Sequence, residues 1–169
     1  MTTDVLIAYA SKHGSTEQVA RRIAEVLRTH GLTTKVDQAA AVRELDSFRA
    51  VVLGGSIYMG RWHRDANSFL QRHAAALDEI PFAVFALGPG KNTEHDFEES
   101  RHQLDHALAK EPELAPRAVT VFGGKIDPEH LRFPFNRMHA IDIRDWPTIH
   151  AWAAELPGVL GLDREAVSA

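Results

Sequence analysis

The six residues 11–16 combine hydroxyl groups, basic groups and a glycine in a run that can bind a phosphate group. Gly14 permits a tight backbone turn, and the hydroxyls on either side of it can donate hydrogen bonds. If a helix begins after this turn, its free N–H groups complete a cradle for a phosphate dianion. The candidate phosphate-binding residues are Ser11, Lys12, His13, Gly14, Ser15 and Thr16.

A capping box is an alternative interpretation of the same run, because Ser15 and Gln18 have the spacing of a helix N-cap and its N3 partner. Both interpretations can hold together, but a cap needs one hydroxyl, whereas this run has three and a lysine. Two familiar nucleotide loops are excluded, since the chain contains neither G-x-x-x-x-G-K-[ST] nor G-x-G-x-x-G. We therefore expect a phosphate site of another kind.

Glycines flank aromatic residues in a second run, residues 54–63, which suits the binding of a flat ring. Glycine allows close approach of the backbone, and Tyr58 and Trp62 are expected to offer exposed stacking surfaces. The alternative is that both aromatic side chains only cover the end of a sheet. A hydrolase nucleophile at Ser56 is excluded, because the G-x-S-x-G elbow needs glycine where Tyr58 stands.

A third run, residues 88–93, joins permissive backbone to amide and hydroxyl groups. It can reach the edge of a bound ring or form an ordinary strand-to-helix connection. Its candidate cofactor-binding residues are Gly88, Pro89, Gly90, Lys91 and Asn92.

Histidines further along the chain raise the question of a metal site. His95, His102 and His106 share a helical face with Glu99, and histidine pairs at helical spacing can chelate metals. This face lies opposite the apolar positions of the same helix, so we expect it to be solvated and assign no metal site.

Short apolar runs alternate with longer amphipathic stretches along the whole chain. The predicted strands are residues 5–9, 33–36, 51–53, 82–87 and 118–122, and the predicted helices 19–27, 65–77, 97–108 and 146–156. All the strands except 33–36 are apolar on both faces, as in a buried parallel sheet, whereas 33–36 suits an edge. We therefore predict a doubly wound α/β domain over residues 1–160, with a five-stranded parallel sheet and helices on both faces. Residues 161–169 are expected to form a tail, with no core face from Leu162 onwards.

In such a sheet, ligands bind beyond the carboxyl ends of the strands. The runs at 11–16, 54–64, 87–94 and 123–128 all follow predicted strands and should meet there. The segment 125–143 should lie on the same side, and its aromatic and cationic residues suit a ring system with carboxylates or carbonyls. The alternative is a surface loop packed against the last helix. The residues concerned are Arg132, Phe133, Pro134, Phe135, Asn136, Arg137, Met138 and His139.

Composition narrows the class of protein. The 169 residues carry a net charge of −4, which excludes nucleic-acid binding by bulk charge, and the absence of cysteine excludes disulfides and thiol chemistry. No stretch approaches the ~18 apolar residues of a membrane span. The chain start lacks the pattern of a signal peptide, so we expect a cytoplasmic protein with no transmembrane segment.

These residues together resemble the flavodoxin superfamily. The runs 55–63 (GSIYMGRWH), 122–127 (FGGKID) and 144–146 (RDW) are similar to the menaquinone-dependent protoporphyrinogen dehydrogenase branch. The resemblance implies a flavodoxin-like strand order 2-1-3-4-5 and FMN as cofactor. It also implies that Tyr58 or Trp62 stacks on the ring and that residues 88–92 border its pyrimidine end. The implied ring contacts are Ser56, Ile57, Tyr58, Met59, Gly60 and Trp62. The branch carries a longer basic and apolar insertion after the fifth strand, where residues 127–143 are short and of mixed charge.

The expected function is that of an FMN-dependent oxidoreductase, acting on protoporphyrinogen or a quinone-type aromatic substrate. No side chain is assigned as a catalytic acid or base, although His63 is the nearest candidate. One alternative is a small electron-transfer flavodoxin that serves protein redox partners, although such carriers are often more acidic. Another is a flavin-free binding module. A receiver domain is excluded, because Ser11 and the run 54–56 occupy its acidic positions. The oligomeric state stays open.

Overall fold

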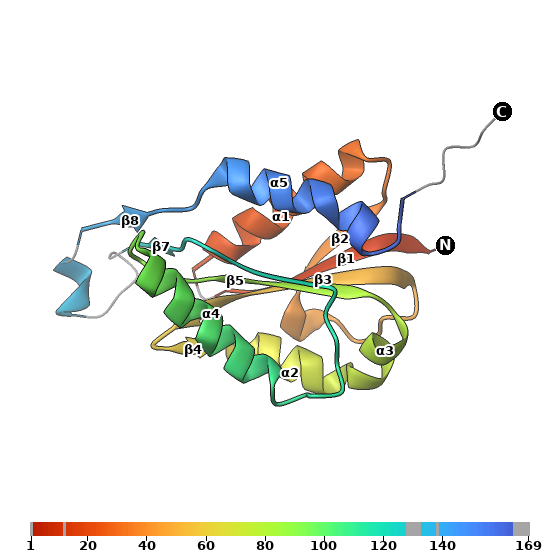
Figure 1. Cartoon of the computed structure of the whole chain (residues 1–169), viewed down its shortest axis with the longest axis horizontal. Coiled ribbons are helices and arrows are strands. Elements are labelled where there is room, and N and C mark those ends of the chain that lie inside the picture. Colours follow the sequence, from red (N-terminus) through yellow and green to blue (C-terminus); the bar gives the residue numbers. More distant parts are fainter. Residues whose placement is uncertain (1, 12, 128–132, 138, 164–169) are drawn as a thin grey trace.

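The computed structural model describes residues 2–11, 13–127, 133–137 and 139–163. Five long strands form a parallel sheet at its centre, in the order β2-β1-β3-β5-β6 (Figure 1). Because β5 and β6 are the fourth and fifth long strands of the chain, this is the predicted order 2-1-3-4-5. The strands are β1 (Thr3–Ala10), β2 (Thr34–Gln38), β3 (Phe48–Tyr58), β5 (Phe82–Leu87) and β6 (Ala118–Phe122).

The sheet has a polar strand at one edge and a hairpin at the carboxyl end of β3. The polar strand is β2, whose place at the edge agrees with its composition. A two-residue strand, β4 (Arg61–Trp62), pairs antiparallel with the end of β3 and forms the hairpin. This hairpin was not expected from the sequence, and it decides where the aromatic residues of the second run lie.

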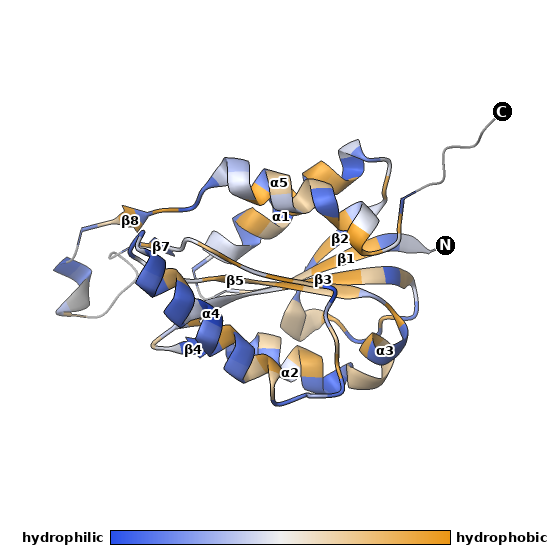
Figure 2. Cartoon of the chain, in the orientation of Figure 1, coloured by the Kyte–Doolittle hydropathy of each residue, from blue (hydrophilic) through white to orange (hydrophobic). Residues whose placement is uncertain are grey.

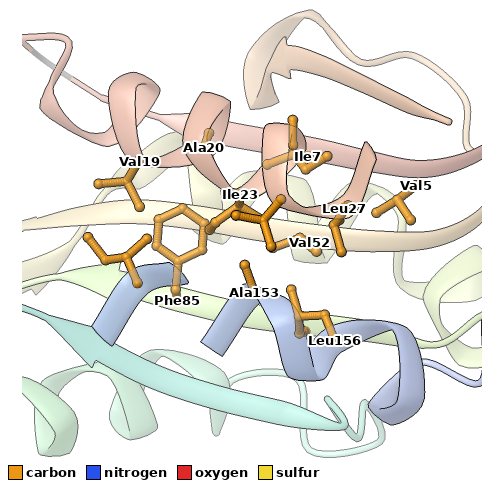
Figure 3. Packing of buried hydrophobic residues seen from close by; sticks show 14 of the residues in the cluster. Val5, Ile7, Val19, Ala20, Ile23, Leu27, Val52, Phe85, Ala153 and Leu156 are labelled. Atoms are coloured by element: carbon orange, nitrogen blue, oxygen red, sulfur yellow. The ribbon is translucent and has the colours of Figure 1, made fainter. Parts of the chain in front are cut away.

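Helices cover both faces of the sheet, because alternate residues of a buried strand point to opposite sides. In β1, Val5 and Ile7 pack towards α1 (Ser15–Thr29) and α5 (Trp146–Val159), as Figure 3 shows, whereas Leu6 and Ala8 belong to the opposite core. The opposite face carries η1 (Ala39–Ala41), α2 (Arg64–Arg72), α3 (Ala74–Glu79) and α4 (Glu94–Leu108). Figure 2 shows hydrophobic residues along the central strands and hydrophilic ones along the outer side of α4. The predicted doubly wound α/β domain is confirmed.

The helix predicted over 65–77 is two helices that meet at His73. This residue ends α2 and caps α3, and its side chain is buried with the ring centroid 4.6 Å from that of Phe69. Its Nε2 lies 3.3 Å from the carbonyl oxygen of Val42. Burial lowers the pKa of His73, because it disfavours the charged ring. The break therefore places a neutral histidine in the core.

The C-terminal end of α5 corrects the prediction for the tail. Gly161 has a φ of 68°, and Leu162 N–H donates to the carbonyl of Pro157 at 2.7 Å, which is the Schellman arrangement. Leu162 is only 4 % exposed and belongs to the core. The expectation that residues from Leu162 onwards lack a core face is wrong at this residue, because the turn directs its side chain back under the helix.

The segment between β6 and α5 contains a small second sheet at the carboxyl-end edge of the main sheet (Figure 1). Its strands are β7 (Lys125–Ile126) and β8 (Ile141–Asp142), which pair antiparallel, and a short helix, η3 (Phe135–Arg137), lies between them in the chain. Two residues predicted to contribute to this segment, Arg132 and Met138, lie outside the described residues.

Candidate functional site

The turn between β1 and α1 has the geometry of an anion-binding loop. Gly14 adopts a φ of 87°, a left-handed conformation that residues with side chains rarely adopt. Ser11 Oγ accepts a hydrogen bond from Gly14 N–H at 2.9 Å, which closes the turn. The helix α1 begins at Ser15, so Gly14 is the N-cap, and no side chain among the described residues caps the helix. The capping-box alternative is therefore wrong, since Ser15 lies inside the helix.

Within the described residues, the first turn of α1 holds a buried hydroxyl without a hydrogen-bond partner. The first N–H groups of any α-helix lack acceptors within the helix, and here no capping side chain of the described residues supplies one. Thr16 is fully buried, and its Oγ1 has no hydrogen-bond partner within the described part of the chain. A buried hydroxyl left unpaired costs about 1–3 kcal/mol. An anionic oxygen at this point would satisfy both the hydroxyl and the helix N-terminus.

The other residues near Thr16 in the chain differ in burial and in charge. Ser11 and Ser15 are partly buried and His13 is exposed, while Lys12 lies outside the described residues. Glu17, the acidic residue of the first turn, accepts hydrogen bonds from Tyr9 Oη at 2.8 Å and from Arg21 at 3.0 Å. These bonds lower the pKa of Glu17, so the carboxylate is charged, and Arg21 offsets part of that charge.

The β3–β4 hairpin projects apolar side chains from the sheet edge. Met59 and Gly60 have φ values of 51° and 75°, the pair of positive values typical of a type I′ hairpin turn. A non-glycine residue in this region costs roughly 1–2 kcal/mol. Met59 is 80 % exposed and Tyr58 52 % exposed. The hairpin tip therefore holds two large side chains where the sequence predicted contact with a ring.

Trp62 is not the exposed aromatic residue that the sequence predicted. Its side chain is 3 % exposed, and its Nε1 donates a hydrogen bond to the carbonyl of Gly55 at 3.0 Å. A Cβ on Gly55 would lie 2.7 Å from that nitrogen, and one on Gly54 would lie 1.9 Å from the Phe85 ring. These two glycines make room for core side chains, so Trp62 supports the hairpin from within the core rather than presenting a stacking face.

His63 is the helix cap of α2. Its Nδ1 accepts a hydrogen bond from the backbone N–H of Asp65 at 3.0 Å. The geometry accounts for His63 as a structural residue.

A pocket of about 360 Å³ separates the hairpin tip from the loop after β5. The predicted ring-contacting residues that line it are Ile57, Met59, Gly60, Gly88, Pro89, Gly90 and Lys91. Four predicted residues, Ser56, Tyr58, Trp62 and Asn92, are not among the lining residues. The small sheet completes the wall through Ile126 and Ile141. The prediction that the segment after β6 lies beside the other loops is therefore confirmed for β7 and β8.

The turn between β1 and α1 and this pocket follow neighbouring strands at one edge of the sheet. Ala10 of β1 pairs with Gly55 of β3, and Ser56 of β3 pairs with Leu87 of β5. Because adjacent strands lie about 4.8 Å apart, the ends of β1 and β5 are roughly 10 Å apart. One elongated ligand can span that distance, with an anionic group at the first loop and a ring at the second.

Comparison with known proteins agrees with this arrangement. The model of the flavodoxin domain family matches residues 6–141. The chain belongs to the flavodoxin domain family. Membership implies a flavin-binding redox protein. Within the described residues, no helix of this flavodoxin domain is long and apolar enough to cross a membrane, and no three His, Asp or Glu side chains are grouped to hold a metal ion.

Solved structures share the flavodoxin fold at low sequence identity. An archaeal flavodoxin has a TM-score of 0.59 at 12 % identity, over 94 % of this chain and 99 % of its own. A cysteine-to-serine mutant of flavodoxin from Pseudomonas aeruginosa has a TM-score of 0.60 at 19 % identity, with the same coverage. Rubredoxin oxygen:oxidoreductase from Desulfovibrio gigas has a TM-score of 0.61 at 19 % identity, over 99 % of this chain but 38 % of its own. At these identities the likeness shows the fold alone.

Curated relatives match only about half of the chain. The flavodoxin domain is 27 % identical over 84 residues to protoporphyrinogen IX dehydrogenase (quinone) from Escherichia coli strain K12. The match covers 48 % of this chain and 46 % of that protein, and the protein from Escherichia coli O157:H7 matches equally. The matched part thus spans about half the length of these relatives.

Sequence reasoning missed the role of Arg144 beside the first loop. Its side chain is 5 % exposed and forms two hydrogen bonds with Asp142, at 2.9 and 3.0 Å. Its Nη1 also donates to Gln18 Oε1 at 2.6 Å and to the carbonyl of Ser15 at 3.4 Å. The hydrogen bonds from Arg144 to Asp142 lower the pKa of that carboxyl group. Arg144 ties the small sheet to the start of α1, a contact over 129 positions of the chain that no local pattern could reveal.

Proposed function

We propose that this flavodoxin domain binds one FMN, with the phosphate at residues 11–16 and the ring beside residues 56–60 and 88–92. The observation that carries the proposal is the fully buried Oγ1 of Thr16, without a partner in the described residues, at the uncapped start of α1. A phosphate supplies acceptor oxygens, and a helix N-terminus favours negative charge. The residues present therefore fit the phosphate of FMN.

The surrounding charges favour the same ligand. The guanidinium of Arg144 lies against the first turn of α1, where Asp142 offsets part of its positive charge. The acidic side chain of that turn, Glu17, is paired with Arg21. Both carboxylates beside the loop are therefore paired with an arginine, which limits their repulsion of a bound dianion.

The ring end of the proposed site consists mainly of backbone and apolar side chains. Ile57, Met59, Pro89, Ile126 and Ile141 give the 360 Å³ pocket an apolar lining, which excludes water from a bound ring. When bound, FMN supplies the transfer of one or two electrons, while the protein supplies binding, orientation and electrostatics. Tyr58 is half-exposed at the hairpin tip but does not line this pocket, and we propose that its side chain turns to cover one face of a bound ring.

We further propose that the domain is an oxidoreductase acting on protoporphyrinogen or a quinone. The support is the 27 % identity to protoporphyrinogen IX dehydrogenase (quinone) and the position of β7 and β8, whose Ile126 and Ile141 line the ring pocket. Phe133 of this segment is 69 % exposed, and the guanidinium of Arg137 lies 5.1 Å from its ring centroid. Exposed aromatic surface beside a cation suits a ring system with carboxylates or carbonyls.

Two measurements, made one after the other, test the proposal. Titration with FMN and with riboflavin should give an FMN affinity at least about tenfold higher, because the phosphate adds charge-assisted hydrogen bonds. Equal affinities for the two flavins would refute the phosphate site. Turnover of protoporphyrinogen or a soluble quinone by the FMN-loaded protein should exceed that of free FMN. A rate equal to that of free FMN would leave the electron-carrier alternative.

A further inference from the structure

A second and larger cavity lies next to the proposed ring pocket, between α2 and α4. Its volume is about 1070 Å³, and Figure 1 shows both helices on the same face of the sheet, with β4 beside them. Gly60 and Gln103 line both cavities. The hairpin tip and one side chain of α4 therefore form the boundary between this cavity, here called the α2–α4 cleft, and the ring pocket.

The walls of the α2–α4 cleft are cationic, although the whole chain is not. Arg61, Arg64 and Lys110 line it, and Glu111 is the acidic residue among its lining side chains. Arg64 lies 3.9 Å from Asp65, whereas Arg61 and Lys110 make no ion pair within the described residues. Desolvation and the neighbouring Glu113 raise the pKa of Glu111, whose carboxylate lies just beyond the C-terminal end of α4. The net charge of −4 makes this local excess of positive charge distinctive.

The floor of the cleft is apolar. Trp62, Leu70 and Ala107 contribute to it, and each is buried. The wall formed by α4 and its C-terminal end runs from Gln103, at the boundary with the ring pocket, to Lys110, a rise of about 10 Å along a helix. A ligand in this cleft thus meets apolar surface below and the cations of Arg61 and Lys110 at the rim, within reach of the hairpin tip.

We propose that the α2–α4 cleft binds an organic anion, namely an apolar ring system carrying carboxylate or sulfonate groups. The ring packs on the apolar floor, and the anionic groups pair with Arg61 and Lys110. That this anion belongs to the substrate class of the flavin rests on the proposed function, because only the shared wall at Gly60 and Gln103 relates the cleft to the ring pocket. Binding of the anion itself needs no flavin.

The experiment uses 8-anilinonaphthalene-1-sulfonate, a fluorescent aromatic anion, titrated into the full chain with and without saturating FMN. The test variant is Arg61→Glu/Lys110→Glu, and Arg61→Gln/Lys110→Gln separates loss of attraction from added repulsion. The control is Lys35→Glu/Arg43→Glu, which changes the net charge equally at exposed residues outside the lining of the cleft. We expect the charge-reversed cleft variant to weaken probe binding by about tenfold or more, the neutral variant by less, and the control by less than about twofold.

Each result has a defined meaning. Displacement of the probe by FMN, or equal weakening in the cleft and control variants, would overturn the inference, because the probe would then occupy the ring pocket or respond to bulk charge. FMN affinity, measured in parallel, should be the same in all variants. If the protein binds no FMN but the cleft variant alone loses the probe, the proposed function fails while the anion site stands. Thermal unfolding of each variant confirms that it is folded.

Discussion

Replacing Thr16 by valine should move stability and ligand binding in opposite directions. Valine keeps the shape of the side chain and removes the hydroxyl, which is fully buried and has no partner in the described residues. Without flavin, the variant is relieved of an unsatisfied buried group worth about 1–3 kcal/mol. For a chain of 169 residues, 1 kcal/mol shifts Tm by roughly 2–4 °C. We therefore expect a rise of about 2–12 °C in the Tm of the flavin-free protein.

FMN binding should weaken in the same variant. The hydroxyl loses a hydrogen bond to a charged phosphate oxygen, worth about 1.5–3 kcal/mol, which corresponds to a tenfold to hundredfold increase in Kd. Riboflavin affinity should stay unchanged, because riboflavin has no phosphate for Thr16 to contact. Fluorescence titrations with both flavins, together with unfolding curves, measure all three quantities.

The control for this experiment lies at the other end of the same helix. Thr29 Oγ1 donates to the carbonyl of Val26 at 2.6 Å, so Thr29→Val removes a satisfied hydroxyl. This variant should lose stability and keep its FMN affinity. If Thr16→Val instead lowered the Tm of the flavin-free protein and left the Kd for FMN unchanged, the hydroxyl would have a structural partner and the reasoning would be refuted.

Three further predictions follow from other side chains. Trp62→Phe leaves the Gly55 carbonyl without its indole donor, so thermal melts should show a free energy of unfolding lower by about 1–3 kcal/mol. Tyr58→Ala should change the free energy of unfolding by under about 0.5 kcal/mol but should reduce the quenching of bound flavin fluorescence. Arg144→Met should raise the Kd for FMN and destabilise the fold, and the added change Asp142→Asn should recover part of the stability but none of the affinity. Because burial lowers the pKa of His73, the unfolded chain binds the proton more tightly than the folded chain, so stability should fall as the pH drops below 6.5. In unfolding titrations between pH 6.5 and about 5, His73→Gln should make stability depend less steeply on pH.

The fold followed from local patterns because buried parallel strands need apolar residues on both faces. The runs 5–9, 82–87 and 118–122 correspond closely to β1, β5 and β6. The run 51–53 gave only the middle of β3, whose later part continues through Gly54 and Gly55 to Tyr58. A loop was predicted at those two glycines, yet they are strand residues. Glycine is required there because the Phe85 ring and the Trp62 indole occupy the space that a Cβ would fill.

The candidate site was predictable in part, for a related reason. The runs after β1 and β5 are loops, as predicted, since the carboxyl ends of parallel strands meet at one edge, whereas the run 54–63 is mostly the end of β3 and the hairpin strand β4. The roles of individual side chains were harder, because they depend on contacts between distant parts of the chain. The buried indole of Trp62 donates to the carbonyl of Gly55 across a hairpin that no local sequence pattern indicated. Arg144 donates to the carbonyl of Ser15, which is 129 positions away in the chain.

The two ends of the proposed FMN site differ in how they are held, and this difference assigns them different tasks. The phosphate loop is fixed by the Ser11–Gly14 bond, by the helix that follows it and by Arg144 behind it. The hairpin tip has an exposed Met59 at a positive φ, in a conformation that glycine would adopt at less cost. The peptide at Met59 carries the cost of a non-glycine residue at positive φ, whereas the turn before α1 has a glycine at its positive φ and is closed by a hydrogen bond. Affinity should therefore depend mainly on the phosphate loop, and a response to the redox state of a bound flavin mainly on the peptide between Met59 and Gly60.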